Sequence, residues 1–215
     1  MELRMLGGLE VSHDDGPVDL GPPKLRLLLA VLLCRLNRAV PVPDLVDAVW
    51  PDDPPASAVA NLRSYVHQLR RTVGSGAIDR HGAAYRLVVA PESVDATRFA
   101  AMVGQARARL ADGDLRAAAG EFRRGLALWR GRPFAGLPYR PELARTAYRL
   151  EEQRLDALER CVAIELEQDV HAGLVQDLLD AVTEHPFRER LRGQLMTALH
   201  RTGRRAEALR AYRDF

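Results

Sequence analysis

The 215-residue sequence contains one lysine, two cysteines and no long apolar segment. Cys34 and Cys161 are too few for a disulfide framework or a cysteine-rich zinc site. The longest apolar run, residues 27–34, falls far short of the ~18 residues that a membrane span requires. The N-terminus carries Glu2 and Arg4 early and shows no apolar signal region, so we expect a cytoplasmic protein with no membrane partner.

Charge of either sign is not in excess, because 31 Lys+Arg face 29 Asp+Glu and the formal net charge is +2. This balance excludes a uniformly basic protein, but it leaves open a local basic surface. The 47% hydrophobic and 28% charged fractions are typical of a folded globular protein. At roughly 150 residues per domain, the length predicts one or two domains.

The chain changes character near residue 95, and eight of its 13 prolines lie in residues 1–55. The patterns before this point predict a strand, a short strand, three helices and a hairpin, over residues 2–11, 18–20, 22–37, 41–50, 56–73 and 77–89. Strands, three helices and a hairpin are the order of a winged helix-turn-helix domain. We therefore predict a winged-helix domain over residues 1–94, with small β-sheets and a β-hairpin wing.

Residues 95–215 are helical almost throughout. The expected helices are 95–110, 114–129, 141–168, 171–184, 187–201 and 205–215. The turns at Gln168 and Gly203 lie 35 residues apart, close to the ~34-residue tetratricopeptide period. The predicted fold class is thus mainly α, a winged helix followed by an all-α tetratricopeptide-like domain over 95–215. No capping signal precedes Phe215, so we expect that the domain is truncated at its C-terminus.

The predicted helix 56–73 contains three arginines and no acidic residue. Val59, Leu62, Val66, Leu69 and Val73 recur at helical spacing and predict its buried stripe. The opposite face suits the major groove of DNA, where amide side chains pair with adenine and small residues admit the backbone. Its predicted base-facing residues are Asn61, Ser64, His67 and Gln68.

Basic side chains flank this face and continue into the hairpin. They would hold phosphates, which fix register rather than sequence. The predicted phosphate or wing residues are Arg63, Arg70, Arg71, Arg80, His81 and Arg86. An ordinary surface helix with a polar outer face is the alternative for the helix, and a core role is an alternative for Tyr85 and Leu87 in the hairpin.

Several segments resemble one family. The run "VPVPDLVDAVWPDDPPASAVANL" is similar to the OmpR-type winged-helix domain of the Streptomyces antibiotic regulatory proteins. The motifs "VDATRFAAMV", "LALWRGRPF" and "EHPFRERLRGQLMTALHRTGRRAEALRAY" resemble the bacterial transcriptional activation domain of the same proteins. The resemblance covers about the whole chain. By position, it implies that Ser64 and Gln68 face bases and that Arg70 and Arg71 face the DNA backbone.

The resemblance implies a transcriptional activator of antibiotic biosynthesis genes. Such a protein binds direct repeats in double-stranded promoter DNA near the −35 region, associates with itself there, and recruits RNA polymerase through contacts that include the sigma factor. The alternative is a protein-interaction module, in which the tetratricopeptide-like half binds a partner and the winged helix is structural. We expect no enzyme, because no nucleophile motif occurs. We also expect no metal or cofactor, because the six histidines lack metal-ligand spacing.

Overall fold

The computed structural model describes residues 1–168 and 173–213. These residues form two compact units. Unit 1 comprises Met1–Ala101 and Ala127–Glu152, and unit 2 comprises Met102–Leu126 and Gln153–Phe215. The chain passes between the units within two of its helices. The predicted domain boundary between residues 94 and 95 stays a prediction.

Unit 1 begins with an antiparallel sheet in the order β1-β2-β3. Its strands are β1 (Glu2–Arg4), β2 (Glu10–His13) and β3 (Gly16–Val18). The prediction of one strand over residues 2–11 was wrong, because the chain reverses between β1 and β2. Gly7 lies in this connection with φ +147°, a conformation that favours glycine. A Cβ at Gly7 would also stand 3.1 Å from the Cβ of Arg130.

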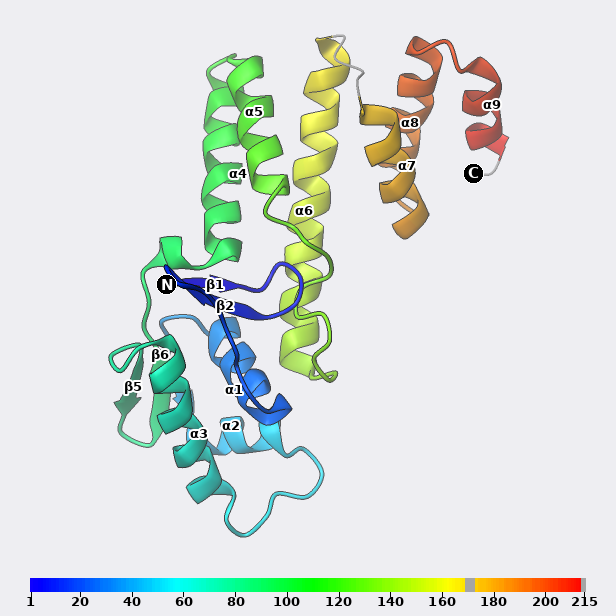
Figure 1. Cartoon of the computed structure of the whole chain (residues 1–215). Helices are drawn as coiled ribbons and strands as arrows, with labels where there is room; N and C mark the ends of the chain where they lie inside the picture. The colour runs from blue at the N-terminus through cyan, green and yellow to red at the C-terminus, as the bar shows by residue number, and fades with distance from the viewer. Residues whose placement is uncertain (169–172, 214–215) are drawn as a thin grey trace. The chain divides into compact units, whose positions relative to one another are not determined.

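The winged helix follows as predicted. Its elements are α1 (Pro23–Cys34), β4 (Val40–Pro41), α2 (Val42–Val49), α3 (Ala58–Val73), β5 (Ile78–His81) and β6 (Ala84–Leu87). The strands form a second sheet in the order β4-β6-β5. Leu28, Leu29 and Leu32 of α1 are fully buried, and α1 and α2 lie beside α3 in Figure 1. This confirms the winged-helix fold class.

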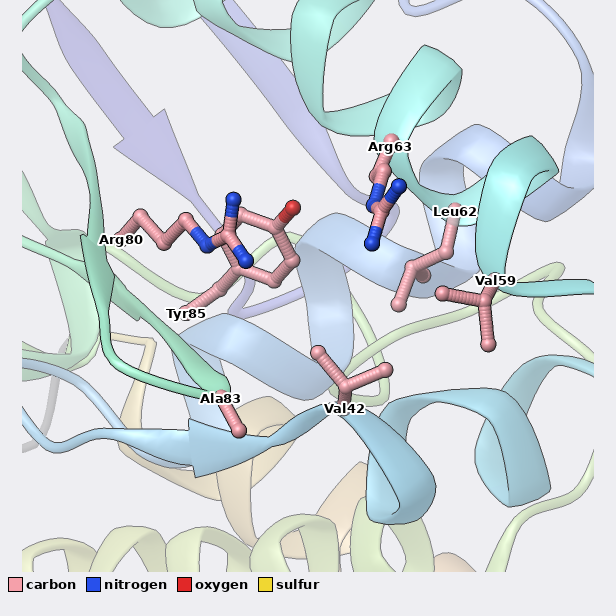
Figure 2. Close-up of a pocket in the computed structure, with 7 residues that line it drawn as sticks. All are labelled: Val42, Val59, Leu62, Arg63, Arg80, Ala83 and Tyr85. Carbon is pink, nitrogen blue, oxygen red and sulfur yellow. The ribbon is translucent and has the colours of Figure 1, made fainter.

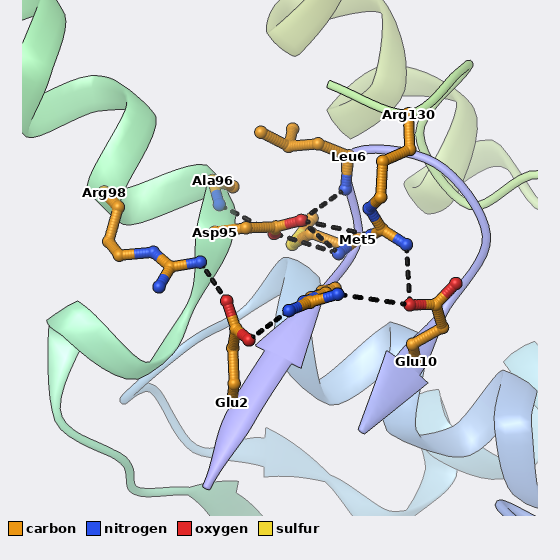
Figure 3. A network of polar contacts seen from close by, with 9 residues as sticks. Glu2, Met5, Leu6, Glu10, Asp95, Ala96, Arg98 and Arg130 are labelled. Carbon is orange, nitrogen blue, oxygen red and sulfur yellow. Dashed lines mark hydrogen bonds and ion pairs between the residues drawn. The ribbon is translucent and has the colours of Figure 1, made fainter. Parts of the chain in front are cut away.

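Asp95 joins the first sheet to the helix that follows the wing. After a short 3-10 turn, η1 (Pro91–Ser93), helix α4 (Asp95–Ala111) begins at Asp95, whose side chain is 2% exposed. Its carboxylate accepts hydrogen bonds from the backbone N–H groups of Met5 at 2.9 Å, Leu6 at 3.0 Å and Ala96 at 2.8 Å (Figure 3). Burial raises the pKa of Asp95 against these donors and Arg130, all of which lower it.

The start of α6 (Pro141–Glu167) also belongs to unit 1. Arg35 at the end of α1 forms an ion pair with Glu142. The Nε–H of Arg140 donates to the carbonyl of Ala48 in α2 at 2.6 Å. Because these bonds reach α1 and α2, the first part of α6 forms one body with the winged helix.

Unit 2 is built from helices alone in its described residues. Its remaining elements are α5 (Leu115–Leu126), α7 (Leu174–Glu184), α8 (Glu189–Arg201) and α9 (Arg205–Arg213). Leu178, Leu191 and Ala198 are buried in its core with Val162 of α6. Helix α8 packs against both α7 and α9. This confirms the predicted all-α architecture of the second part. Parts of two predicted helices, residues 171–172 and 214–215, lie outside the described residues.

Arg123 connects three helices of unit 2. Its guanidinium group forms two hydrogen bonds to Glu165 of α6, at 2.7 and 2.6 Å, and an ion pair with Asp177 of α7. Bidentate pairing of this kind is among the stronger polar interactions in proteins. It therefore holds α5, α6 and α7 in a fixed register.

A search of the described residues for a membrane-spanning helix found none, because every helix is either too short or too polar.

Candidate nucleic-acid interface

Helix α3 buries one side and exposes the other. Leu62, Val66, Leu69 and Val73 are buried, as the apolar stripe predicted. The prediction for Val59 was wrong, because its side chain is 43% exposed. Ala58 is buried in the first turn instead. The apolar side chain of Val59 is therefore available at the surface.

The predicted base-facing residues occupy the outer face of α3. Ser64, His67 and Gln68 are exposed, and Asn61 is half-buried. The side-chain amide of Asn61 donates to the Ser57 hydroxyl at 3.1 Å, which ties it to the residue before the helix. The structure thus places the four residues on one helix, and three of them are exposed. Their role as base contacts stays a prediction.

The predicted phosphate residues divide into two groups by their partners. The Nε–H of Arg70 donates to the carbonyl of Ile78 in β5 at 2.9 Å, and Arg86 pairs with Asp79 at 3.2 Å. These two arginines fasten the wing to α3 and its two strands to each other. The sequence did not reveal these bonds, because a basic side chain carries no local signal of its partner. The other basic candidates, Arg63, Arg71, Arg80 and His81, are exposed.

The wing is the hairpin of β5 and β6, residues 78–87. Its register pairs Ile78 with Leu87 and His81 with Ala84. Gly82 turns the chain with φ +60°. Tyr85 and Leu87 are buried, so the core role considered for them holds, whereas Arg80 and His81 lie exposed near the tip.

A hollow of about 140 Å³ lies between α3 and the wing. It is lined by Val42, Val59, Leu62, Arg63, Arg80, Ala83 and Tyr85. Figure 2 shows Arg63 and Arg80 extending into it from opposite sides, and the Tyr85 hydroxyl between them. The floor is apolar and the charged groups of its lining are both cationic, so the hollow suits an anion with an apolar portion.

An aromatic stack supports α3 from behind. The rings of Trp50 and Tyr65 are stacked with centroids 5.8 Å apart, and the ammonium group of Lys24 lies 5.0 Å from the Trp50 centroid. A cation over a tryptophan face is attracted by the ring. The single lysine thus joins α1 to the end of α2, while arginine supplies the basic groups of the interface.

The rest of the described chain offers little for catalysis. No cluster of three or more histidine, cysteine or acidic residues suited to a metal ion occurs in these residues. Burial raises the pKa of the Cys34 thiol to about 11 and that of Cys161 to about 12. A thiol with so high a pKa is a poor nucleophile, because the thiolate is the reactive form. The acid-free third helix lies beside a basic wing, and a helical second part follows them. This arrangement defines the class of winged-helix transcriptional regulators that carry a helical second part.

Comparisons with known proteins place the chain within this class. The profile of the bacterial transcriptional activator domain matches residues 94–215. The regulatory protein DnrI of Streptomyces peucetius is 35% identical over 224 residues, which cover 99% of this chain and 82% of DnrI. The regulatory protein AfsR of Streptomyces coelicolor is 37% identical over 211 residues, which cover 98% of this chain and 21% of AfsR. The chain belongs to the Streptomyces antibiotic regulatory protein family.

A solved structure confirms the fold. The structure of Mycobacterium tuberculosis EmbR in complex with a low affinity phosphopeptide matches with a TM-score of 0.89 and 31% identity, over 99% of this chain and 57% of that chain. The chain spans about a fifth of the length of AfsR and just over half of EmbR. These relatives are named as regulatory proteins rather than as enzymes.

Proposed function

We propose that this chain is a sequence-specific DNA-binding activator of transcription. The observation that carries the proposal is the outer face of α3, which exposes Ser64, His67 and Gln68 between arginines and holds no acidic residue. A helix of this kind fits the major groove, and a wing beside it reaches the adjacent backbone or minor groove. The remainder of residues 1–95 is acidic on balance, which limits non-specific binding to DNA.

The proposed targets are direct repeats near the −35 region of promoters for antibiotic biosynthesis genes. On these repeats two or more copies associate and recruit RNA polymerase, including its sigma factor. The family membership supports this part of the proposal, since the relatives include regulators named DnrI and RedD. On the helical unit, the apolar side chains of Phe187 and Tyr212 are 95% and 64% exposed, and we propose them as contacts for the protein partner.

Binding to a promoter fragment and to a scrambled fragment tests the proposal, in gel shifts over a range of salt. We expect preference for the promoter and an affinity that falls steeply with salt. Gln68→Ala should relax preference at one base step by roughly 1–3 kcal/mol. Arg71→Ala should weaken binding to all sequences alike and reduce the salt slope by about 1.

Equal binding of the wild type to both fragments would refute sequence-specific recognition. Uniform losses in both variants would show that the division into base and phosphate contacts is wrong. If the chain binds no DNA, the result favours the alternative of a protein-interaction module, in which the winged helix is a structural domain. If the chain does bind the promoter, a footprint with and without polymerase separates DNA binding from recruitment, and Phe187→Ala is the variant expected to affect recruitment alone.

A further inference from the structure

We propose that the hollow between α3 and the wing holds a single phosphate of the DNA backbone, which Arg63 and Arg80 bind together. This inference rests on the proposed function. It adds that the helix and the wing share one anchoring point on DNA. The helix and the wing would then bind DNA as a single unit rather than as two independent contacts.

The charge of the hollow favours an anion. Its lining contains two arginines and no carboxylate. Guanidinium groups bind phosphate oxygens through paired N–H donors, and the Tyr85 hydroxyl lies between them in Figure 2 as a further donor. The volume of about 140 Å³ is several times the ~10–15 Å³ that one water molecule needs in a cavity. The hollow therefore has room for a group larger than water, and a phosphate is such a group.

The contacts of the neighbouring arginines also indicate that Arg63 and Arg80 are the two that bind the phosphate. Arg70 is bound to Ile78 and Arg86 to Asp79, so both are engaged within the protein. Among the described residues, no acidic group lies within ion-pair distance of Arg63. In the part of the chain that the structure describes, the one hydrogen bond of Arg80 runs from its Nε–H to the Gly82 carbonyl of its own turn, at 3.2 Å. Both terminal N–H₂ groups of Arg80 thus remain for a ligand.

The apolar floor explains the exposure of Val59. This residue has the helical spacing of the buried residues of α3, yet it is 43% exposed. It lines the hollow together with Val42. A deoxyribose attached to the bound phosphate presents a largely apolar surface, which would cover Val59. When α3 lies in a major groove and the wing in the next minor groove, one sugar-phosphate strand runs between the two elements. The hollow is lined by residues of both elements, so this strand would pass it.

A methylphosphonate scan tests the shared phosphate. Each backbone phosphate of a footprinted operator is replaced in turn by an uncharged methylphosphonate, and the dissociation constant is measured for the full chain. For the wild type, we expect one position per half-site at which the replacement weakens binding about tenfold. In Arg63→Ala and in Arg80→Ala, this loss should shrink to less than about twofold at that same position.

Arg71→Ala is the matched control, since Arg71 is an exposed arginine of the same helix that does not line the hollow. It should leave the loss at the shared position unchanged. The Arg63→Ala/Arg80→Ala double variant should lose less affinity than the product of the two single losses. Circular dichroism would verify that each variant is folded.

The proposal is overturned if the two arginines map to different phosphates, or if the double loss equals the product. It is also overturned if no single position responds while the wild type still prefers its operator. Loss of preference for operator over scrambled DNA in the wild type is a different result, because it refutes the proposed function itself.

Discussion

Asp95 offers a quantitative test of how the wing-bearing unit is held together. Replacing it with alanine removes an acceptor for three backbone N–H groups, those of Met5, Leu6 and Ala96. A hydrogen bond to a charged group contributes about 1.5–3 kcal/mol, and an orphaned buried donor costs about 1–3 kcal/mol. Water can reach part of the site once the carboxylate is gone, so the costs of the three lost hydrogen bonds do not add fully. We expect Asp95→Ala to lower the free energy of unfolding by about 3–4 kcal/mol.

Urea denaturation followed by tryptophan fluorescence measures this loss. Trp50 and Trp129 both belong to unit 1, and Trp129 packs edge-to-face on Phe99 of α4 at 5.4 Å. The signal therefore reports the unit that contains Asp95. The matched control is Glu10→Ala, which also removes a carboxylate partner of Arg130, at 2.7 Å, but from a side chain that is 50% exposed. This control should lose less than about 1 kcal/mol.

The pH dependence supplies an independent check of the same residue. The pKa of Asp95 is raised in the folded state, with burial as the largest cause. The stability linked to this shift is present below its ordinary value of 3.8 and is lost as the pH rises through the folded-state pKa. Relative to Asp95→Asn, the wild type should therefore gain stability as the pH is lowered toward 4. Equal losses in Asp95→Ala and Glu10→Ala, or an opposite pH trend, would refute the reasoning.

Three further predictions concern other parts of the structure. Arg123→Ala should destabilise unit 2 by about 2–3 kcal/mol in thermal or urea unfolding followed by circular dichroism. The control Arg124→Ala, whose partner lies on its own helix, should cost less than about 1 kcal/mol. Equal costs would contradict the bridging role of Arg123. The pKa of Glu2 is lowered, chiefly by its hydrogen bond to an arginine of the same strand, so the advantage of the wild type over Glu2→Gln should be present above pH 4.5 and disappear as the pH falls through the lowered pKa. Cys34 and Cys161 should resist iodoacetamide at pH 8 in the folded protein, because burial raises both thiol pKa values. Both should react on unfolding, as mass spectrometry would show. Rapid labelling of the folded chain would count against that burial.

Local patterns were sufficient for much of the fold. The three helices before the wing, the hairpin and the helices of the second part follow from apolar periodicity and from the positions of proline and glycine. The predicted helix 56–73 differs from α3 by two residues at its start, and the wing strands differ by a few residues at their ends. These features depend on neighbours within a turn or two of chain, which the sequence displays directly.

The sequence alone also determined which helix is acid-free and which of its faces carries Ser64 and Gln68. Only the tertiary structure decided which basic residues are open to a ligand. Arg70 and Arg63 look alike in the sequence, yet one is bound to Ile78 and the other lines the hollow. The exposure of Val59 and the bonds from Met5 and Leu6 to Asp95 were decided in the same way. Both depend on residues that are distant in the chain and brought together by folding.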